Sequence, residues 1–172
     1  MCFGLSHGVP AILLVLLKIA SKFNDKATEK LLSTVINGMM EYLSFADKSF
    51  FPLFETRNEG LIRNDRIGWC YGDVSCAYSI MLVGIFLNNE EFIKISKTIL
   101  LHYCKMSNEL TSKIIDPDFC HGTIGIAHIY SRVYNIMHED IYKETAQFWY
   151  NQTLSKSNFA NGVAGFMHYD SF

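Results

Sequence analysis

Residues 118–125 read DFCHGTIG, and the order of side chains in this stretch predicts how the chain folds around it. Cys120 and His121 are adjacent, so they cannot share one face of a regular helix. At a bent helix entrance, however, both side chains can point at one atom. Gly122 and Gly125 follow directly, which is typical of a crowded entrance where backbones approach closely. The stretch therefore predicts a tight helix start that presents two potential metal ligands.

Three other stretches superimpose on CHGTIG (120–125): SHGVPA (6–11), CYGDVS (70–75) and ANGVAG (160–165). Each has a Gly followed three positions later by a small residue. The first three in chain order precede an apolar helical run, and an amphipathic run separates each from the next. This loose repeat predicts helix pairs with an inner apolar ring and an outer amphipathic ring, whose entrances gather at one end. For residues 160–165 the simpler interpretation, a crowded helix start without chemistry, remains open.

Helical periodicity dominates the chain, and no strand of period two is predicted. Asn89 is the expected cap of one helix, because Asn accepts hydrogen bonds from the first turn. The connector 47–66, which contains Pro52 and Gly60, is expected to be a loop. The predicted helices cover residues 10–23, 26–45, 75–87, 89–104, 124–136 and 140–152.

Composition narrows the class of protein. The 172 residues suffice for one domain, and a net charge of −2 gives no basic surface for nucleic acid. The apolar run 9–17 is too short to cross a bilayer, and no signal peptide is predicted. An odd, widely spaced set of cysteines fits reduced thiols in the cytosol better than a disulfide framework. The five are Cys2, Cys70, Cys76, Cys104 and Cys120.

Cys70 occupies the position in its repeat that Cys120 occupies in the next, so Cys70, Cys120 and His121 are predicted to meet. Two thiolates and an imidazole suit zinc, and three protein ligands with an open fourth position are typical of a catalytic zinc site. The alternative is that these are buried structural cysteines, since free Cys is among the most buried residue types.

The motifs GLSHG (4–8), GWCYGD (68–73) and DFCHGTIG (118–125) resemble those of the lanthionine synthetase C-like cyclase family, in the family's order. The resemblance implies an all-α fold, an α/α toroid of inner and outer helix rings. It implies that residues 1–172 form a single such domain with about half of the usual seven helix pairs. The expectation is a C-terminal fragment that lacks the N-terminal pairs, including an active-site aspartate.

The resemblance also implies roles for individual residues. His7 matches the family's catalytic histidine, Arg66 an active-site arginine and Tyr71 an active-site tyrosine. Pro10 and Ser75 depart from the pattern, because a second Gly or another small residue is usual there. The implied Zn²⁺ ligands are Cys70, Cys120 and His121, with water or a substrate thiol as the fourth.

The implied function is that of a zinc-dependent lanthionine cyclase in lantibiotic biosynthesis. Such an enzyme adds a Cys thiol of a dehydrated precursor peptide to dehydroalanine or dehydrobutyrine and closes a thioether ring. Expected partners are the peptide, a dehydratase and transporter of the biosynthetic complex, and a missing N-terminal half; no nucleic acid is expected. The expected location is cytoplasmic, with membrane association through that complex. Two alternatives remain open: an inactive or partner-dependent zinc-binding fragment, and a glutathione-adding or glutathione-binding protein.

Several neighbours of the predicted ligands have a plain structural interpretation beside a functional one. Asp73 and Asp118 flank the ligands, and either could orient His121, as could a backbone carbonyl. Trp69 is expected to wall the site or to fill the core. His128 is expected to be a core or lumen histidine. The remaining cysteines, Cys2, Cys76 and Cys104, are expected to serve packing.

Overall fold

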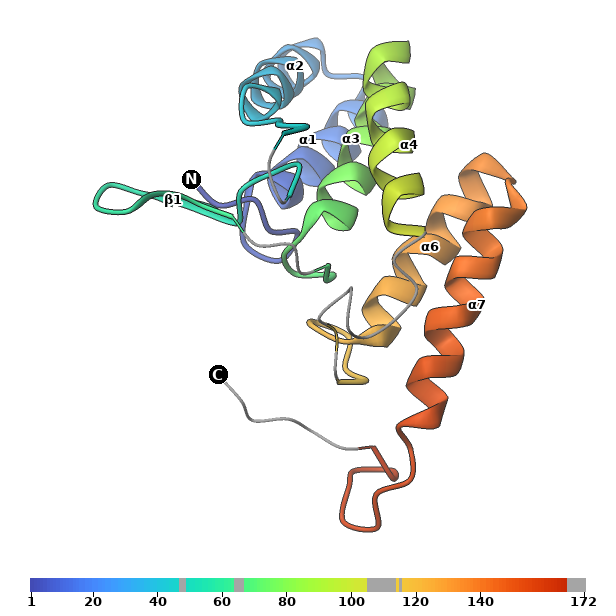
Figure 1. The fold of residues 1–172 in the computed structure, drawn as a ribbon. Coiled ribbons are helices and arrows are strands. Elements are labelled where there is room, and N and C mark those ends of the chain that lie inside the picture. Colours follow the sequence, from blue (N-terminus) through green and yellow to red (C-terminus); the bar gives the residue numbers. More distant parts are fainter. Residues whose placement is uncertain (47–48, 64–66, 105–113, 115, 167–172) are drawn as a thin grey trace.

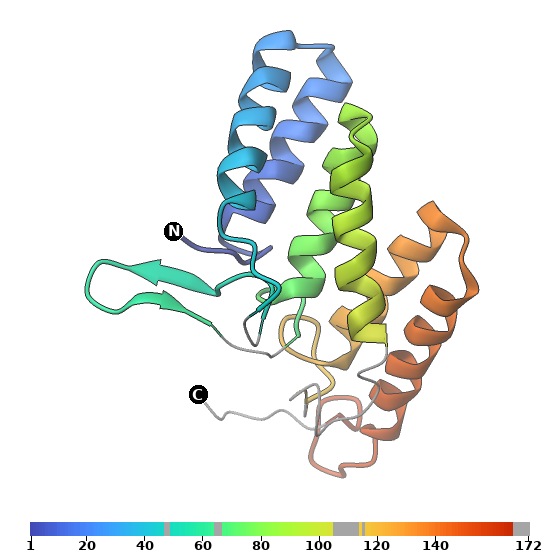
Figure 2. The ribbon, with the colours of Figure 1, turned by 45° about the horizontal axis from the view of Figure 1, so that its top comes forward.

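The computed structural model of the chain describes residues 1–46, 49–63, 67–104, 114 and 116–166. Three helix hairpins lie side by side in the described part (Figures 1 and 2). A short chain reversal joins the two helices of each hairpin. The helices are α1 (Val9–Phe23), α2 (Lys26–Met40), α3 (Asp73–Leu87), α4 (Glu90–Cys104), α6 (Thr123–Met137) and α7 (Asp140–Ser155).

The helices fall into two rows. Helices α1, α3 and α6 pack successively against one another, and α2, α4 and α7 each pack on the preceding helix of their own hairpin. Helix α3 lies between α1, α4 and α6, so ten of its fifteen residues are buried. This burial on several sides explains why α3 is apolar all round. The fold is therefore all-α, with inner and outer helices as predicted, and the described hairpins form part of a toroid.

The predicted helices are present, and capping residues set several of their ends. The Asp25 side chain accepts a hydrogen bond from the Ala27 amide at 3.0 Å, which starts α2. Asn89 accepts one from the Phe92 amide at 3.1 Å, so the predicted cap of α4 is confirmed. Asn88 ends α3 in the left-handed conformation with φ 52°.

The C-terminal end predicted for the second helix is wrong. Helix α2 ends at Met40 rather than at residue 45. The Arg63 guanidinium donates a hydrogen bond to the Tyr42 carbonyl at 3.1 Å, and the Ser44 amide donates to the Phe50 carbonyl at 2.9 Å. These partners, the first of them 21 positions away, satisfy the backbone after α2 in place of a further helical turn.

The prediction that the connector is a loop without strands is also wrong. The connector contains an antiparallel hairpin of β1 (Phe54–Thr56) and β2 (Gly60–Ile62), which projects from the helices in Figure 1. Gly60 has φ +70°, a conformation that most other residues avoid, and it closes the turn opposite Thr56. Strands of three residues are too short to produce a readable alternation of polar and apolar side chains.

The fourth repeat begins no helix within the described residues. Residues 160–166 form turns, in which the Phe159 amide donates to the Gly165 carbonyl at 2.9 Å. Ala164 and Gly165 both have positive φ, 52° and 85°. The expected last inner helix would continue into 167–172, which lie outside the described residues.

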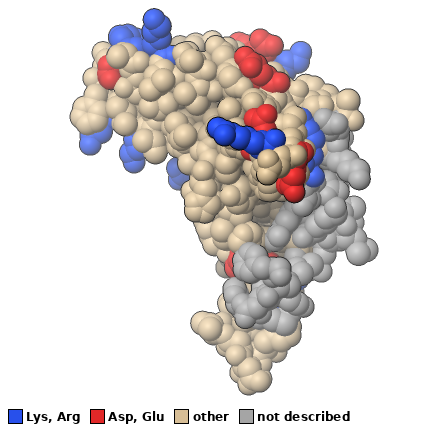
Figure 3. All heavy atoms as spheres, turned by 90° about the vertical axis from the view of Figure 1, so that its left-hand side faces the viewer, with Lys and Arg blue, Asp and Glu red and all other residues tan. Residues whose placement is uncertain are grey.

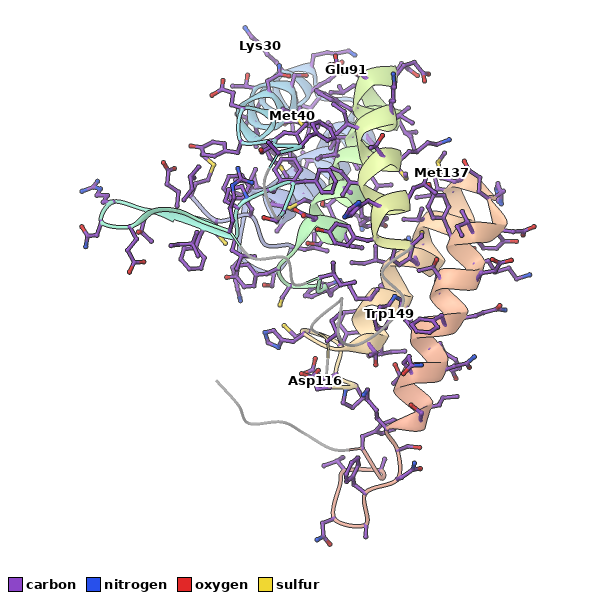
Figure 4. The ribbon with its side chains drawn as sticks, in the orientation of Figure 1. Lys30, Met40, Glu91, Asp116, Met137 and Trp149 are labelled. Carbon is purple, nitrogen blue, oxygen red and sulfur yellow. The ribbon has the colours of Figure 1, made fainter. Side chains whose placement is uncertain are left out.

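The core runs along the contacts between the two rows of helices. Trp149 lies between α7 and α6 and is fully buried (Figure 4). Seen from the side of the β hairpin, most of the coloured surface is uncharged, and charged side chains of both signs are scattered over it (Figure 3). Within the described residues, every helix is too short or too polar to traverse a bilayer.

Candidate metal centre

The N-terminal ends of α1, α3 and α6 lie at the same end of the three hairpins (Figure 2). Backbone contacts join these entrances directly. The Ser6 amide donates to the Cys70 carbonyl at 3.5 Å, and the Cys70 amide donates to the Cys120 carbonyl at 3.0 Å. Gly4 forms an antiparallel bridge with Tyr71. The entrances thus meet as the repeat predicts, although each belongs to a different hairpin.

Two glycines permit this close meeting of chains. A Cβ atom on Gly4 would collide with the Cys70 carbonyl oxygen and with the Tyr71 ring. A Cβ atom on Gly122 would collide with the backbone of Asp118. In both places the obstacle includes backbone, which cannot swing aside as a flexible side chain can. The glycines in the motifs therefore reflect a steric requirement of the entrances.

The three residues predicted as metal ligands lie together. One ligand atom from each of Cys70, Cys120 and His121 falls within 4.8 Å of the other two. Cys70 is buried, and the other two are partly exposed. In a tetrahedral zinc site, bonds of about 2.3 Å to sulfur and about 2.0 Å to nitrogen place the ligand atoms about 3.5 to 3.8 Å apart. The set of two sulfurs and one nitrogen fits zinc in chemistry, and the three atoms lie close enough together to hold one metal ion.

Asp118 organises the backbone and the side chain of His121. Its Oδ1 atom accepts hydrogen bonds from the His121 amide at 2.7 Å and the Gly122 amide at 3.0 Å. Its Oδ2 atom lies 3.9 Å from His121 Nδ1. This carboxylate thus satisfies backbone amides at the entrance of α6 and faces the imidazole.

Asp73, the other acidic neighbour, turns away from the cluster. Its carboxylate accepts hydrogen bonds from the Phe50 and Phe51 amides, both at 2.8 Å, and from the Tyr103 hydroxyl at 2.6 Å. Burial raises the pKa of Asp73, and the Tyr103 hydroxyl and the two amides act against that rise. Its contacts tie α3 to the preceding loop and to α4, so its role is structural.

Of the residues predicted to be catalytic, His7 and Tyr71 lie near one another. Their ring centroids are 6.5 Å apart, and the His7 side chain is exposed. Tyr71 directly follows Cys70 and therefore lies beside the cluster. Arg66, the third predicted residue, lies outside the described residues.

An aromatic row extends from the cluster along α6. The Trp69 and Phe119 ring centroids are 5.1 Å apart, and those of Phe119 and His128 are 5.3 Å apart. His128 is exposed over most of its surface, and its partial burial, followed by the charge of Arg132, lowers its pKa. His128 belongs to this row and not to the cluster, and Trp69 is partly buried against the hydrophobic core.

Of the three remaining cysteines, two are buried in helices and serve packing, and the third contacts Tyr71. Cys76 is buried inside α3, where its thiol donates to the Phe3 carbonyl at 3.1 Å. Cys104 is buried in α4. Cys2, in contrast, is partly exposed, and its thiol donates to the Tyr71 hydroxyl oxygen at 3.7 Å. The sequence gives no sign of this contact, because the two residues are 69 positions apart and meet only through the folded entrances.

Comparison with known proteins places this arrangement in a family. A solved structure of nisin cyclase superimposes with a TM-score of 0.75 at 20% sequence identity, which shows a shared fold. The match covers 91% of this chain and 41% of nisin cyclase, so the chain spans less than half the length of that protein. A search of curated proteins finds no match. The family model for lanthionine synthetase C-like proteins matches residues 2–170, and the chain therefore belongs to that family.

Proposed function

We propose that this protein acts in zinc-dependent thioether formation, adding a Cys thiol of a peptide to a dehydroalanine or dehydrobutyrine of the same peptide. The observation that carries the proposal is the cluster of Cys70, Cys120 and His121, whose ligand atoms lie within 4.8 Å of one another. Membership of the lanthionine synthetase C-like family and the likeness to nisin cyclase support it.

Cys70, Cys120 and His121 would hold the zinc ion, and a substrate thiol would take the fourth position. When bound, the ion would supply one thing, a lower pKa for such a thiol, which is about 8.5 when free, and so a reactive thiolate. The negative charges of Cys70 and Cys120 offset the charge of the ion. The attacking sulfur therefore stays electron-rich.

The reaction is a Michael addition without any redox step. A C–S bond forms at the β-carbon of the dehydro residue, and the π electron pair moves toward the carbonyl to give an enolate. A proton then adds to the α-carbon, which replaces the proton lost from the thiol. His7 would deliver this proton, because imidazole is the side chain best suited to proton transfer near neutral pH. Tyr71 would donate a hydrogen bond to the developing negative charge. Arg66 remains a predicted source of fixed positive charge.

The proposed substrate is a dehydrated precursor peptide. A dehydratase must supply the unsaturated residues, so we propose that it acts before this protein, within a biosynthetic complex that includes a transporter. We place this chemistry in the cytoplasm, where thiols stay reduced. All five cysteines carry thiols and not disulfides, which agrees with that placement.

The first prediction concerns His7. Replacing His7 with Asn should abolish thioether formation while bound zinc stays at the wild-type level, because His7 is not among the clustered ligand residues. Metal content is measured by elemental analysis, and ring closure by loss of free thiol in a synthetic peptide that carries one Cys and one dehydroalanine. Full activity of His7→Asn would remove His7 from the mechanism.

The matched control is Cys120→Ala, which should lose both zinc and activity. Retention of stoichiometric zinc by Cys120→Ala would show that the cluster is not the metal site. Glutathione offered with a peptide that has dehydroalanine but no Cys provides a further arm. Faster addition of glutathione than of the peptide's own thiol would favour the glutathione-adding alternative.

A second candidate, a zinc-binding module that needs a partner for activity, is favoured by one surface. Helix α1 carries an exposed apolar stripe, made up of Ile12, Val15, Ile19 and Phe23. We propose residues 1–172 as one domain of this family, whose stripe faces further helix pairs of a toroid. Zinc binding by the isolated chain without thioether formation would support this second candidate over the first.

A further inference from the structure

We propose that Cys2 is a positioning residue, whose thiol holds the Tyr71 hydroxyl in the orientation that serves the reaction. This inference rests on the proposed function, because it assumes that Tyr71 takes part in the addition. It concerns a residue outside the three motifs that carry the family resemblance. The contact itself is a hydrogen bond from Cys2 Sγ to the Tyr71 hydroxyl oxygen at 3.7 Å, within the range of sulfur donors.

The backbone around Cys2 is fixed from two sides. On one side, its two neighbours in the chain bond to β1 and to Leu53, which precedes β1. The Phe3 amide donates to the Leu53 carbonyl at 2.9 Å, and the Glu55 amide donates to the Met1 carbonyl at 2.8 Å. On the other side, the Cys2 carbonyl accepts from the Val9 amide, in the first turn of α1, at 2.9 Å. The Cys2 thiol therefore starts from a defined position rather than from a free chain end.

The Tyr71 ring is confined by the same segment. Gly4 forms a bridge with Tyr71, and the ring lies where a Cβ atom on residue 4 would collide with it. His7, three residues further on, places its imidazole 6.5 Å from the Tyr71 ring, measured between centroids. Residues 2–7 thus pass over Tyr71 and bring a thiol and an imidazole to it.

The direction of the hydrogen bond gives the contact its consequence. A tyrosine hydroxyl has one proton to donate and can also accept. Because the Cys2 thiol donates to the Tyr71 oxygen, the phenolic proton is left for another acceptor. In the proposed reaction that acceptor is the substrate oxygen on which negative charge develops. Cys2 thereby restricts the rotation of the hydroxyl about its C–O bond and favours donation to substrate.

The test compares zinc-loaded wild type with Cys2→Ala, Cys2→Ser, Tyr71→Phe and the double variant Cys2→Ala/Tyr71→Phe. Loss of one neutral hydrogen bond should lower kcat of Cys2→Ala by about twofold to about tenfold with KM unchanged. Cys2→Ser retains a donor and should recover most of that loss. In the Tyr71→Phe background, Cys2→Ala should have no further effect on kcat.

Two results would overturn the proposal. The first is a kcat of Cys2→Ala equal to that of wild type. The second is that Cys2→Ala lowers kcat by the same factor in the Tyr71→Phe background as it does in wild type. If Cys2→Ala does not fold, Cys2→Val replaces it, because Val fills the space without a donor. A Cys2→Ser variant as slow as Cys2→Val would also count against the hydrogen bond.

Failure of the proposed function can be distinguished from failure of this inference. If zinc-loaded wild type does not close any ring, the function proposed above fails. The same variants are then compared by urea denaturation. Non-additive effects of Cys2→Ala and Tyr71→Phe on the free energy of unfolding would support the contact, and additive effects would overturn it.

Discussion

At the scale of single residues, Asp118 performs two tasks with its two carboxylate oxygens. One oxygen accepts hydrogen bonds from the His121 and Gly122 amides, and the other faces the His121 imidazole at 3.9 Å. A histidine that binds a metal commonly has its second nitrogen oriented by a carboxylate, which fixes the ring and raises its basicity. Asp118 is the carboxylate in position to do this.

Replacing Asp118 with Ala should therefore weaken zinc binding by about tenfold to about 100-fold. Asp118→Asn should have a smaller effect, because the amide oxygen still accepts from the two backbone amides while the charge is lost. Zinc affinity is measured by competition with a chromophoric chelator. Asp140→Asn, an exposed change in the first turn of α7, is the control and should bind zinc like wild type. Equal affinities for Asp118→Ala and the control would contradict this role.

At the scale of elements, Asp73 connects three parts of the fold. It stands at the first turn of α3, and its carboxylate binds the amides of Phe50 and Phe51 and the hydroxyl of Tyr103 near the end of α4. Because Asp73 is only 2% exposed, water cannot replace these partners when the carboxylate is removed. The segment before the β hairpin is thus anchored to the helix that follows Cys70.

Asp73→Asn should lower the free energy of unfolding by about 2 to 4 kcal/mol, because the amide group presents a donor to groups that are themselves donors. Tyr103→Phe removes a single partner and should cost about 1 kcal/mol. Both values come from urea denaturation followed by circular dichroism. A loss in Asp73→Asn no larger than that in Tyr103→Phe would show that the two backbone amides find other acceptors.

The start of α4 provides an independent measurement on one helix. Asn89→Ala removes the acceptor for the Phe92 amide and should destabilise the protein by about 1 kcal/mol. Asn89→Asp keeps an acceptor and places negative charge at a helix N-terminus, so it should match or exceed wild-type stability. A neutral effect of Asn89→Ala would indicate that water caps α4 equally well.

At the scale of the whole molecule, several acidic groups are buried in neutral form. Burial raises the pKa of Cys76 and Tyr130 well above their usual values. A group with a raised pKa in the folded state stabilises the fold fully below its unfolded pKa. That contribution is lost as pH rises toward the folded pKa. The protein should therefore lose stability in alkali.

For Cys76, unfolding releases a thiol of pKa about 8.5, so wild type should lose about 2 kcal/mol more than Cys76→Ala between about pH 8 and about pH 10. Cys76→Ala also starts from lower stability, since it loses the contact with the Phe3 carbonyl. The difference in slope is the quantity measured, by urea denaturation at a series of pH values. Parallel curves would show that Cys76 becomes exposed to solvent before unfolding.

The sequence by itself predicted the helices and the meeting of Cys70, Cys120 and His121. Apolar periodicity located the helices to within a few residues at most ends, because burial of one face is written into residue order. The repeated Gly-x-x-small entrances placed Cys70 and Cys120 in equivalent positions, and the folded chain brings them together with His121. A local pattern was enough to identify the entrances, because glycine is needed there where backbones approach closely.

Tertiary structure alone decided what depends on partners distant in sequence. The end of α2 at Met40 depends on Arg63, and the β hairpin arises in strands too short to show a pattern. Tertiary structure also distinguishes Asp73 from Asp118, although the sequence predicted that either carboxylate could orient His121. The contact of Cys2 with Tyr71 crosses 69 residues. Such contacts form only when separate hairpins pack, so no local pattern of residues records them.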